Sequence, residues 1–224
     1  MELILAVDTA TAYASVALWR PYQVLAEQTW LSRGNHTVEL MPTIVEMMAR
    51  EGVQPKELTG LAVTKGPGSF TGMRIGISLV KGMALALGLP VAAIPTLEVI
   101  AHGQSCRFLP LRAVLQAGRG RLCWADFRWE RGAWRQVGGL QLGRLPELVA
   151  GIERRTLFAG ELGEQEVAYI QESLGPAAVI ASPAEGLRRA AYLAEIAYRR
   201  LKRKQAEELT FSPTYLMPGA EPVE

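Results

Sequence analysis

Short apolar runs separated by turn residues fill the first thirty positions of the chain. Residues 3–7 are almost continuously apolar and end at Asp8, and two further runs cover 15–19 and 24–30. A turn containing Pro21 separates the second run from the third. Three closely spaced runs of this kind predict an antiparallel meander of strands.

Two later segments repeat their apolar residues at helical spacing. The first opens at Asn35 or Thr37 and runs to about Arg50, with Pro42 inside it, where a proline should kink the helix or delay its start. The second runs from 73 to 87 and stops at Gly88, with Pro90 beyond it. Both helices are apolar over a wide arc, so each can pack on its own sheet and on a second surface. The alternative is that both arcs are buried inside one domain.

The segment KGPGSFTGMRIG, residues 65–76, joins the apolar run 61–63 to the second helix. This order predicts a strand, a glycine-rich turn and a helix whose first turn Ser69 or Thr71 can cap. Free amides at a helix N-terminus attract anions, so the loop is a candidate phosphate site. It is not a Walker loop, because Gly72 is followed by Met73 and Arg74.

An acidic residue at the end of the first strand, followed by small hydroxyl residues, is a second feature suited to a phosphate or a hydrated divalent ion. The combined candidate set for phosphate or nucleotide is Asp8, Thr9, Thr11, Gly66, Gly68 and Ser69. The alternative is that Asp8 and Thr9 bond only to the amides of their own turn. The pattern leaves both interpretations open.

A change of character at 103–110 predicts a boundary between two lobes, 1–106 and 107–183. Residues 91–94 and 95–101 predict a strand and a short helix before it. After it, the expected strands cover 112–115, 121–127, 134–137, 156–160 and 178–181, and the expected helices start at 146 and cover 164–174. A long helix over 184–208 should pack back on the first lobe, and 209–224 should be an extended tail. We find no internal sequence repeat.

Composition indicates an ordinary globular protein with its own core: 49% of the 224 residues are hydrophobic and 21% are charged. No apolar run reaches the length that a membrane span needs, and no signal peptide is visible. Cys106 and Cys123 suggest unpaired thiols in a reducing cytoplasm. No metal site is expected, because the chain has two histidines and Leu40 stands four residues after His36.

Arginines are concentrated in the second lobe although the net charge is only +2. They alternate with four aromatic residues: Arg107, Arg112, Arg119, Arg121, Trp124, Phe127, Arg128, Trp129, Arg131, Trp134 and Arg135. Such a region can bind a nucleic-acid strand through phosphate contacts and stacking. A half-exposed sheet produces the same alternation, and this alternative stays open.

Several segments together resemble one family. AVDTATAYASVALW (6–19), HTVELMP (36–42) and GPGSFTGMRIG (66–76), with PTLEVIA (95–101) and SPTYLMPG (212–219), are similar to the TsaB family, also called YeaZ. The resemblance implies an α/β, two-lobed fold of the actin, sugar-kinase and heat-shock ATPase (ASKHA) type, with mixed sheets flanked by helices. It also implies a cytoplasmic, non-catalytic partner of the TsaD-type subunit, alongside the TsaE-type ATPase, in tRNA threonylcarbamoyladenosine modification.

The resemblance further implies an interface with TsaD, or with a second copy, built by the two helices. The corresponding residues are His36, Leu40, Met41, Ile44, Met48, Thr71, Gly72, Gly76, Leu79 and Met83. No catalytic residue, metal or cofactor of its own is implied, although ATP and magnesium can sit at a shared interface. The tRNA would be contacted indirectly, through the complex, and no membrane is involved.

The chain departs from the family pattern in its second lobe. Gln116, Gly118 and Arg121 replace an Asp, an Arg and a Glu, and Met217 replaces an Arg of the tail motif. These changes put a nucleotide or metal role of this lobe in doubt. Two alternative functions remain: an active ATPase or phosphotransferase using Asp8, and an RNA-binding module using the arginines.

Overall fold

The computed structural model describes residues 2–215. These residues form two compact units: unit 1 comprises residues 2–99 and 189–215, and unit 2 comprises residues 100–188. We expected the boundary after residue 106, and the two units divide between residues 99 and 100. The predicted tail lies partly in unit 1, and Met217 lies outside the described residues.

Unit 1 is built on a mixed sheet of five strands in the order β3-β2-β1-β4-β5. The strands are β1 (Ile4–Asp8), β2 (Tyr13–Arg20), β3 (Gln23–Leu31), β4 (Gly60–Gly66) and β5 (Val91–Pro95). The first three form the predicted antiparallel meander, with Ile4 opposite Trp19. β4 and β5 extend the sheet in parallel from β1.

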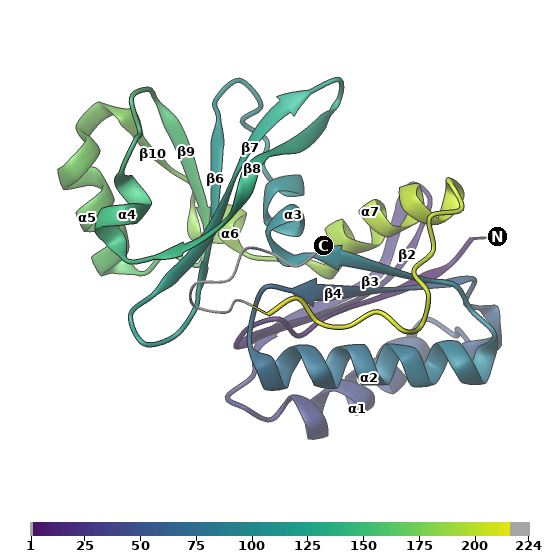
Figure 1. The fold of residues 1–224 in the computed structure, drawn as a ribbon. Helices are drawn as coiled ribbons and strands as arrows, with labels where there is room; N and C mark the ends of the chain where they lie inside the picture. Colours follow the sequence, from purple (N-terminus) through teal and green to yellow (C-terminus); the bar gives the residue numbers. More distant parts are fainter. Residues whose placement is uncertain (1, 216–224) are drawn as a thin grey trace. The chain divides into compact units, whose positions relative to one another are not determined.

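Helices cover both faces of this sheet, which explains why β1 is apolar at nearly every position. Leu3, Leu5 and Val7 face α1 (His36–Arg50) and α2 (Phe70–Leu87), whereas Ile4 and Ala6 face α7 (Ala190–Lys202). Alternate side chains of a strand point to opposite faces, so a strand between two layers must be apolar throughout. Figure 1 shows α1 and α2 side by side along one face and α7 on the other. A short 3-10 turn, η1 (Pro55–Glu57), precedes β4.

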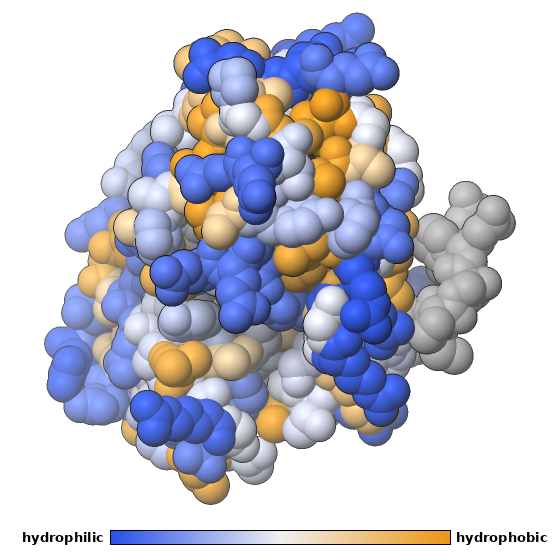
Figure 2. All heavy atoms as spheres, turned by 90° about the vertical axis from the view of Figure 1, so that its left-hand side faces the viewer, coloured by the Kyte–Doolittle hydropathy of each residue, from blue (hydrophilic) through white to orange (hydrophobic). Residues whose placement is uncertain are grey.

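Unit 2 has its own mixed sheet, in the order β10-β9-β6-β7-β8. Its strands are β6 (Leu111–Gln116), β7 (Leu122–Glu130), β8 (Ala133–Gly143), β9 (Thr156–Gly160) and β10 (Ala178–Ile180). Helices α4 (Leu145–Val149) and α5 (Glu164–Leu174) cover one face through Leu148 and Ile170 (Figure 1). On the side of these helices that Figure 2 shows, hydrophilic and hydrophobic residues are mixed, as expected of an outer surface. The remaining short elements are α3 (Thr96–His102), η2 (Gly175–Ala177) and α6 (Pro183–Gly186).

The two units share one topology. Each has a three-strand meander followed by a helix, a parallel strand, a second helix and a further parallel strand. The fold therefore repeats although the sequence shows no repeat, because a topology constrains the hydrophobic pattern and not particular residues. This arrangement of two mixed sheets flanked by helices confirms the predicted ASKHA fold class.

The predicted helix over 184–208 is wrong in its extent. The chain forms α6, then extended backbone at Leu187 and Arg189, then α7, which ends at Lys202. Ser182 caps α6, and the amide of Ala190 donates a hydrogen bond of 2.9 Å to the Ser15 hydroxyl of β2. Contacts that are distant in sequence therefore fix where α7 begins. Helix α1 starts at His36 and continues through Pro42 to Arg50, so its predicted bounds are confirmed and the delayed start that this proline allowed is wrong.

An ion pair between the buried Arg112 and the partly exposed Asp126 connects β6 to β7 in unit 2. The Arg112 guanidinium donates to both carboxylate oxygens of Asp126 at 2.7 Å and also to the carbonyl oxygen of Leu148. The guanidinium lies 5.8 Å from the centroid of the Trp124 ring. Arg112 is therefore committed to the core of unit 2, where removing one partner of the pair leaves an uncompensated charge.

We predict that Asp126→Ala destabilises the protein by about 2 kcal/mol. Loss of one partner of a buried pair costs about 3–5 kcal/mol, and the Asp126 side chain is 42% exposed, which lowers the cost. Urea unfolding followed by tryptophan fluorescence measures the change. Glu130→Ala, on the same strand but exposed, is the control and should change stability by less than about 0.5 kcal/mol. Equal effects of the two variants would contradict the assignment.

The two cysteines are free thiols, as the sequence predicted, and the structure places them in different surroundings. Cys106 is half-buried, and Cys123 is buried in β7, where burial raises its thiol pKa to about 12. Because the thiolate is the reactive form, we predict that iodoacetamide at pH 8 does not alkylate Cys123 in the folded protein. Mass spectrometry should find Cys123 modified only after denaturation. If Cys123 in the folded protein reacted as fast as an exposed thiol, its burial would be refuted.

Candidate functional site

A groove of about 510 Å³ runs between α1 and α2 on the outer side of unit 1. It is lined by Thr37, Leu40, Met41, Phe70, Thr71, Arg74, Ile75, Ser78 and Leu79. Met41 is 43% exposed and Phe70 is 52% exposed, so apolar side chains reach solvent along it. The two helices that the sequence identified as having surplus apolar surface thus form the walls of one concave surface.

The start of α1 is held by the β1–β2 turn and by β3. The Nε2 atom of His36 lies 3.0 Å from the carbonyl oxygen of Thr11, and the His36 side chain is buried. Glu39 accepts a hydrogen bond of 2.8 Å from the Trp30 indole, which lowers the pKa of that carboxyl. These contacts fix one wall of the groove. His36 is therefore a structural residue of unit 1 and is not exposed in the groove.

The glycine loop fixes the other wall by packing on the β1–β2 turn. The amide of Ser69 donates to the carbonyl oxygen of Ala10 at 2.6 Å, and the Ser69 hydroxyl caps α2 by accepting from the amide of Gly72. A Cβ atom at Gly68 would collide with the carbonyl oxygen of Ala10. The close approach of two backbone segments thus requires glycine here.

Two glycines inside α2 serve the same close approach. A Cβ atom at Gly72 would collide with the carbonyl oxygen of Thr9, and one at Gly76 would collide with the Thr9 hydroxyl. Thr9 also donates a hydrogen bond of 2.7 Å to the carbonyl oxygen of Gly72. A large residue at Gly76 would therefore disrupt unit 1 itself, so it is not a test of partner binding.

The residues assigned to the interface from the resemblance divide into two groups. Six are buried within unit 1: His36, Leu40, Ile44, Met48, Gly72 and Gly76. Of these, Leu40 also lines the floor of the groove. Four reach solvent at least in part: Met41, Thr71, Leu79 and Met83. On α1 the wide apolar arc divides into a buried side and a solvent-exposed side, and the exposed side carries Val38, Met41 and Val45. Only packing on the sheet determines which arc of an amphipathic helix is inside.

Sequence reasoning missed the contribution of the C-terminal segment. The amide of Thr214 donates to the carbonyl oxygen of Lys65 at 2.6 Å, which brings Tyr215 against α2. The rings of Tyr215 and Phe70 lie 4.8 Å apart, and the Arg74 guanidinium lies 3.7 Å from the Phe70 ring centroid. Tyr215 therefore packs against two groove residues, Phe70 and Arg74. A local sequence pattern cannot reveal a contact between residues so far apart in the chain.

The candidate phosphate residues lie together around the β1–β2 turn and the glycine loop. The Asp8 carboxylate accepts from the amide of Ala10 at 2.9 Å and from the Thr64 hydroxyl at 3.1 Å. Asp8 and Thr9 are each 1% exposed, and Thr11 is 7% exposed. Asp8 thus bonds to its own turn and also to β4, and the Thr9 hydroxyl donates to Gly72 of α2, so the two residues do not bond only to the amides of their own turn; phosphate binding stays a prediction. Among the described residues, no group of three or more His, Cys, Asp or Glu side chains could hold a metal ion.

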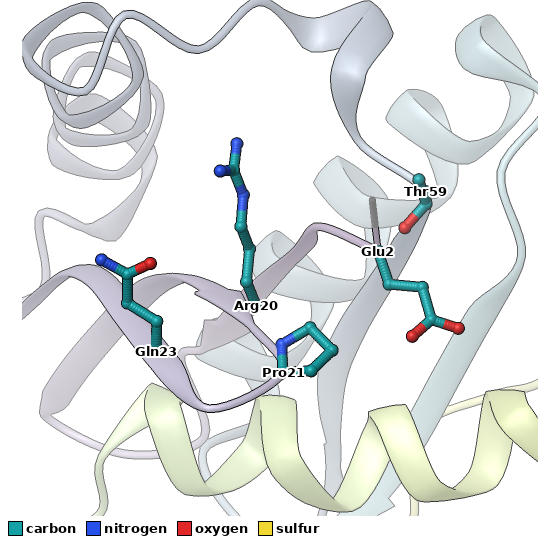
Figure 3. Close-up of a pocket in the computed structure, with 5 residues that line it drawn as sticks. All are labelled: Glu2, Arg20, Pro21, Gln23 and Thr59. Atoms are coloured by element: carbon teal, nitrogen blue, oxygen red, sulfur yellow. The ribbon is translucent and has the colours of Figure 1, made fainter.

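A second cavity of about 560 Å³ lies in unit 1 near the β2–β3 turn, lined by Glu2, Arg20, Pro21, Gln23 and Thr59. Figure 3 shows the Arg20 and Gln23 side chains directed away from the Glu2 carboxylate. A ligand site needs polar groups that converge on one point. This cavity is therefore a weaker candidate for a binding site than the groove between α1 and α2.

Helix α2 is, by length and composition alone, apolar enough to cross a membrane. The sequence analysis found no such run, and Arg74 and Lys81 interrupt the apolar stretch. The core helix of a soluble protein passes the same test, and one such helix is weak evidence for a span. Its packing on β4 and its partly exposed outer side instead mark it as one wall of the groove.

Comparison with known proteins gives concordant matches. The family model described as TsaD, tRNA N6-adenosine threonylcarbamoyltransferase, matches residues 24–214. The chain is 30% identical to the tRNA threonylcarbamoyladenosine biosynthesis protein TsaB of Bacillus subtilis, over 95% of this chain and 93% of the relative. YeaZ from Pseudomonas aeruginosa superimposes with a TM-score of 0.80 at 25% identity, covering 96% of this chain and 100% of that chain. The chain therefore belongs to the TsaB (YeaZ) family.

Proposed function

We propose that this protein is a non-catalytic subunit for tRNA threonylcarbamoyladenosine synthesis that binds a TsaD-type partner through the α1–α2 groove. The observation that supports this most directly is the groove itself, in which Met41, Phe70 and Leu79 leave apolar surface accessible. Apolar surface that is concave and borders polar residues marks a site of protein association. The family membership identifies the pathway in which the partner is sought.

The groove suits a protein partner better than a small substrate. Its walls are two helices, and its polar members, Thr37, Thr71 and Ser78, carry hydroxyl groups without an activating base. Arg74 supplies a cation that is already stacked on Phe70. An apolar helix laid between α1 and α2 would bury the exposed side chains and gain the corresponding hydrophobic free energy.

The surroundings of Asp8 support the non-catalytic part of the proposal. Phosphoryl transfer needs a metal-bound nucleotide and a group that positions the attacking oxygen. Asp8 is buried and bonded to Ala10 and Thr64, which leaves it poorly placed to hold a hydrated ion. Catalysis therefore belongs to the TsaD-type partner, and ATP with magnesium would bind at a shared interface, with the TsaE-type ATPase as a further component.

The same groove offers a surface for a second copy of this chain. A homodimer formed through α1 and α2 would compete with the heterodimer, because both would bury the same side chains. The complex would operate in the cytoplasm, where tRNA is available, and this chain would reach the tRNA within the assembly.

We predict that Met41→Glu weakens binding of the TsaD homologue of the same organism at least tenfold. The side chain is 43% exposed in the groove, and a carboxylate there would be desolvated on binding without a partner. Isothermal titration calorimetry measures the affinity, and circular dichroism verifies the fold. Leu85→Glu is the matched control, because Leu85 lies on α2, is 73% exposed and does not line the groove. Wild-type affinity of Met41→Glu would overturn the groove assignment.

We further predict that the isolated protein has no magnesium-dependent ATPase activity above background. Release of inorganic phosphate should be the same for the wild type and for Asp8→Asn, a change that keeps an oxygen acceptor for Ala10 and Thr64. Hydrolysis that the wild type shows and Asp8→Asn lacks would instead support the alternative of an active phosphotransferase.

A further inference from the structure

The β7–β8 hairpin of unit 2 carries positive charge that the proposed function does not use. Residues 103–142 contain seven arginines and only two acidic residues, Asp126 and Glu130. The structure separates these arginines by what their side chains contact. Arg112 is held in the ion pair with Asp126, and Arg107 lies over the Trp129 ring at 4.2 Å.

Three arginines remain exposed on the hairpin: Arg128 on β7, Arg131 in the turn and Arg135 on β8. We call this set the arginine hairpin. Among the carboxylates of residues 2–215, none forms an ion pair with any of the three; the two nearby acids are Asp126, which pairs with Arg112, and Glu130 of the same hairpin. Arg131 has φ of 50° and Gly132 has φ of 81°, so the turn is tight and projects its side chain at the tip.

Register places two of these charges side by side. Arg128 and Arg135 are direct partners across the antiparallel pair. Directly opposed residues of such a pair have their Cβ atoms about 5 Å apart, and like charges there are unfavourable. The pair is tolerated because both side chains are exposed and can diverge into solvent. An anion between them would remove the repulsion and accept from both guanidinium groups.

The aromatic residues of the β7–β8 hairpin are not available as stacking platforms. Trp124, Phe127 and Trp134 are buried in unit 2, with exposures of 3%, 2% and 9%. Trp129 packs edge to face on Trp134, at 5.6 Å, and is covered by Arg107. The sequence suggested that this region binds nucleic acid by both stacking and phosphate contacts. In the hairpin, only the phosphate contacts of the arginines remain available.

We propose that the arginine hairpin binds the phosphate backbone of RNA. An exposed guanidinium forms paired hydrogen bonds with phosphate oxygens, and a row of phosphates matches three arginines without an internal counter-ion. Because no base is read, binding is independent of sequence and weakens steeply with salt. This inference rests on the proposed function, in which the RNA is the tRNA that the assembly modifies, and it gives this subunit a direct contact with that tRNA.

The test is tRNA binding by the assembled complex with the TsaD homologue, measured by fluorescence anisotropy between about 50 and 300 mM KCl. The variant is Arg128→Gln with Arg135→Gln. Its matched control is Arg154→Gln with Arg155→Gln, which removes the same charge from two exposed arginines elsewhere in unit 2. In the hairpin variant the slope of log K against log salt should be less negative than in the wild type by about 2, because two phosphate contacts are lost.

Calorimetry of complex formation separates the two proposals. A hairpin variant that binds the TsaD homologue normally but keeps the wild-type tRNA affinity and salt slope would overturn the RNA contact alone. An equal loss in the Arg154, Arg155 control would also overturn it, because the effect would then be one of net charge. Loss of the protein complex with unchanged tRNA binding would assign the hairpin to an acidic protein surface. Failure of the wild-type proteins to associate would refute the proposed function instead.

Discussion

The contact between the glycine loop and the β1–β2 turn is the constraint on which the candidate groove depends. Two backbone segments approach so closely that the amide of Ser69 reaches the carbonyl oxygen of Ala10, and Thr9 fits against α2 where side chains are absent. This contact fixes where α2 starts and how it lies on the sheet. The contact between His36 and Thr11 holds α1 to the same turn. The β1–β2 turn therefore positions both walls of the groove.

The two units use one topology for different purposes. In unit 1 the helices after the meander are long, with 15 residues in α1 and 18 in α2, so their outer sides form an extended surface. The equivalent helices of unit 2, α4 and α5, have 5 and 11 residues and mainly cover their own sheet. Unit 2 instead extends its meander into the β7–β8 hairpin, where three exposed arginines reach solvent.

The departures from the family pattern in unit 2 have a local structural meaning. Gly118 has φ of 70° and, with Arg119 and Gly120, builds a turn of positive φ between β6 and β7. The Gln116 amide donates to Glu166 at 3.2 Å and to the carbonyl oxygen of Glu161 at 3.3 Å, as a neutral side chain can. At these positions the chain thus uses turn geometry and neutral hydrogen bonds, and the groove lies among other residues, in unit 1.

Much of the fold could be predicted from the sequence because its signals are local. The spacing of apolar residues predicted the meander, α1, α2 and most of the second sheet, and Gly88 and Pro90 marked the end of α2. The glycine loop and the motifs around it identified the family. Exposed and buried cysteines could not be told apart by spacing, but their unpaired state could be inferred from their number.

Tertiary structure decided what depends on contacts between distant residues. Packing on the sheet determined that Ile44, Met48 and Gly76 face inward while Met41 and Phe70 line the groove. The Ser15 hydroxyl and Val91, both far away in sequence, fix where α7 starts and how the chain returns after it. Cross-strand register alone set Arg128 opposite Arg135, whereas the buried Arg112 pairs with the partly exposed Asp126 carboxylate. The sequence by itself therefore determined most of the helices and strands and the family. Which side of each element is buried was decided only by the packing of the helices on the sheets.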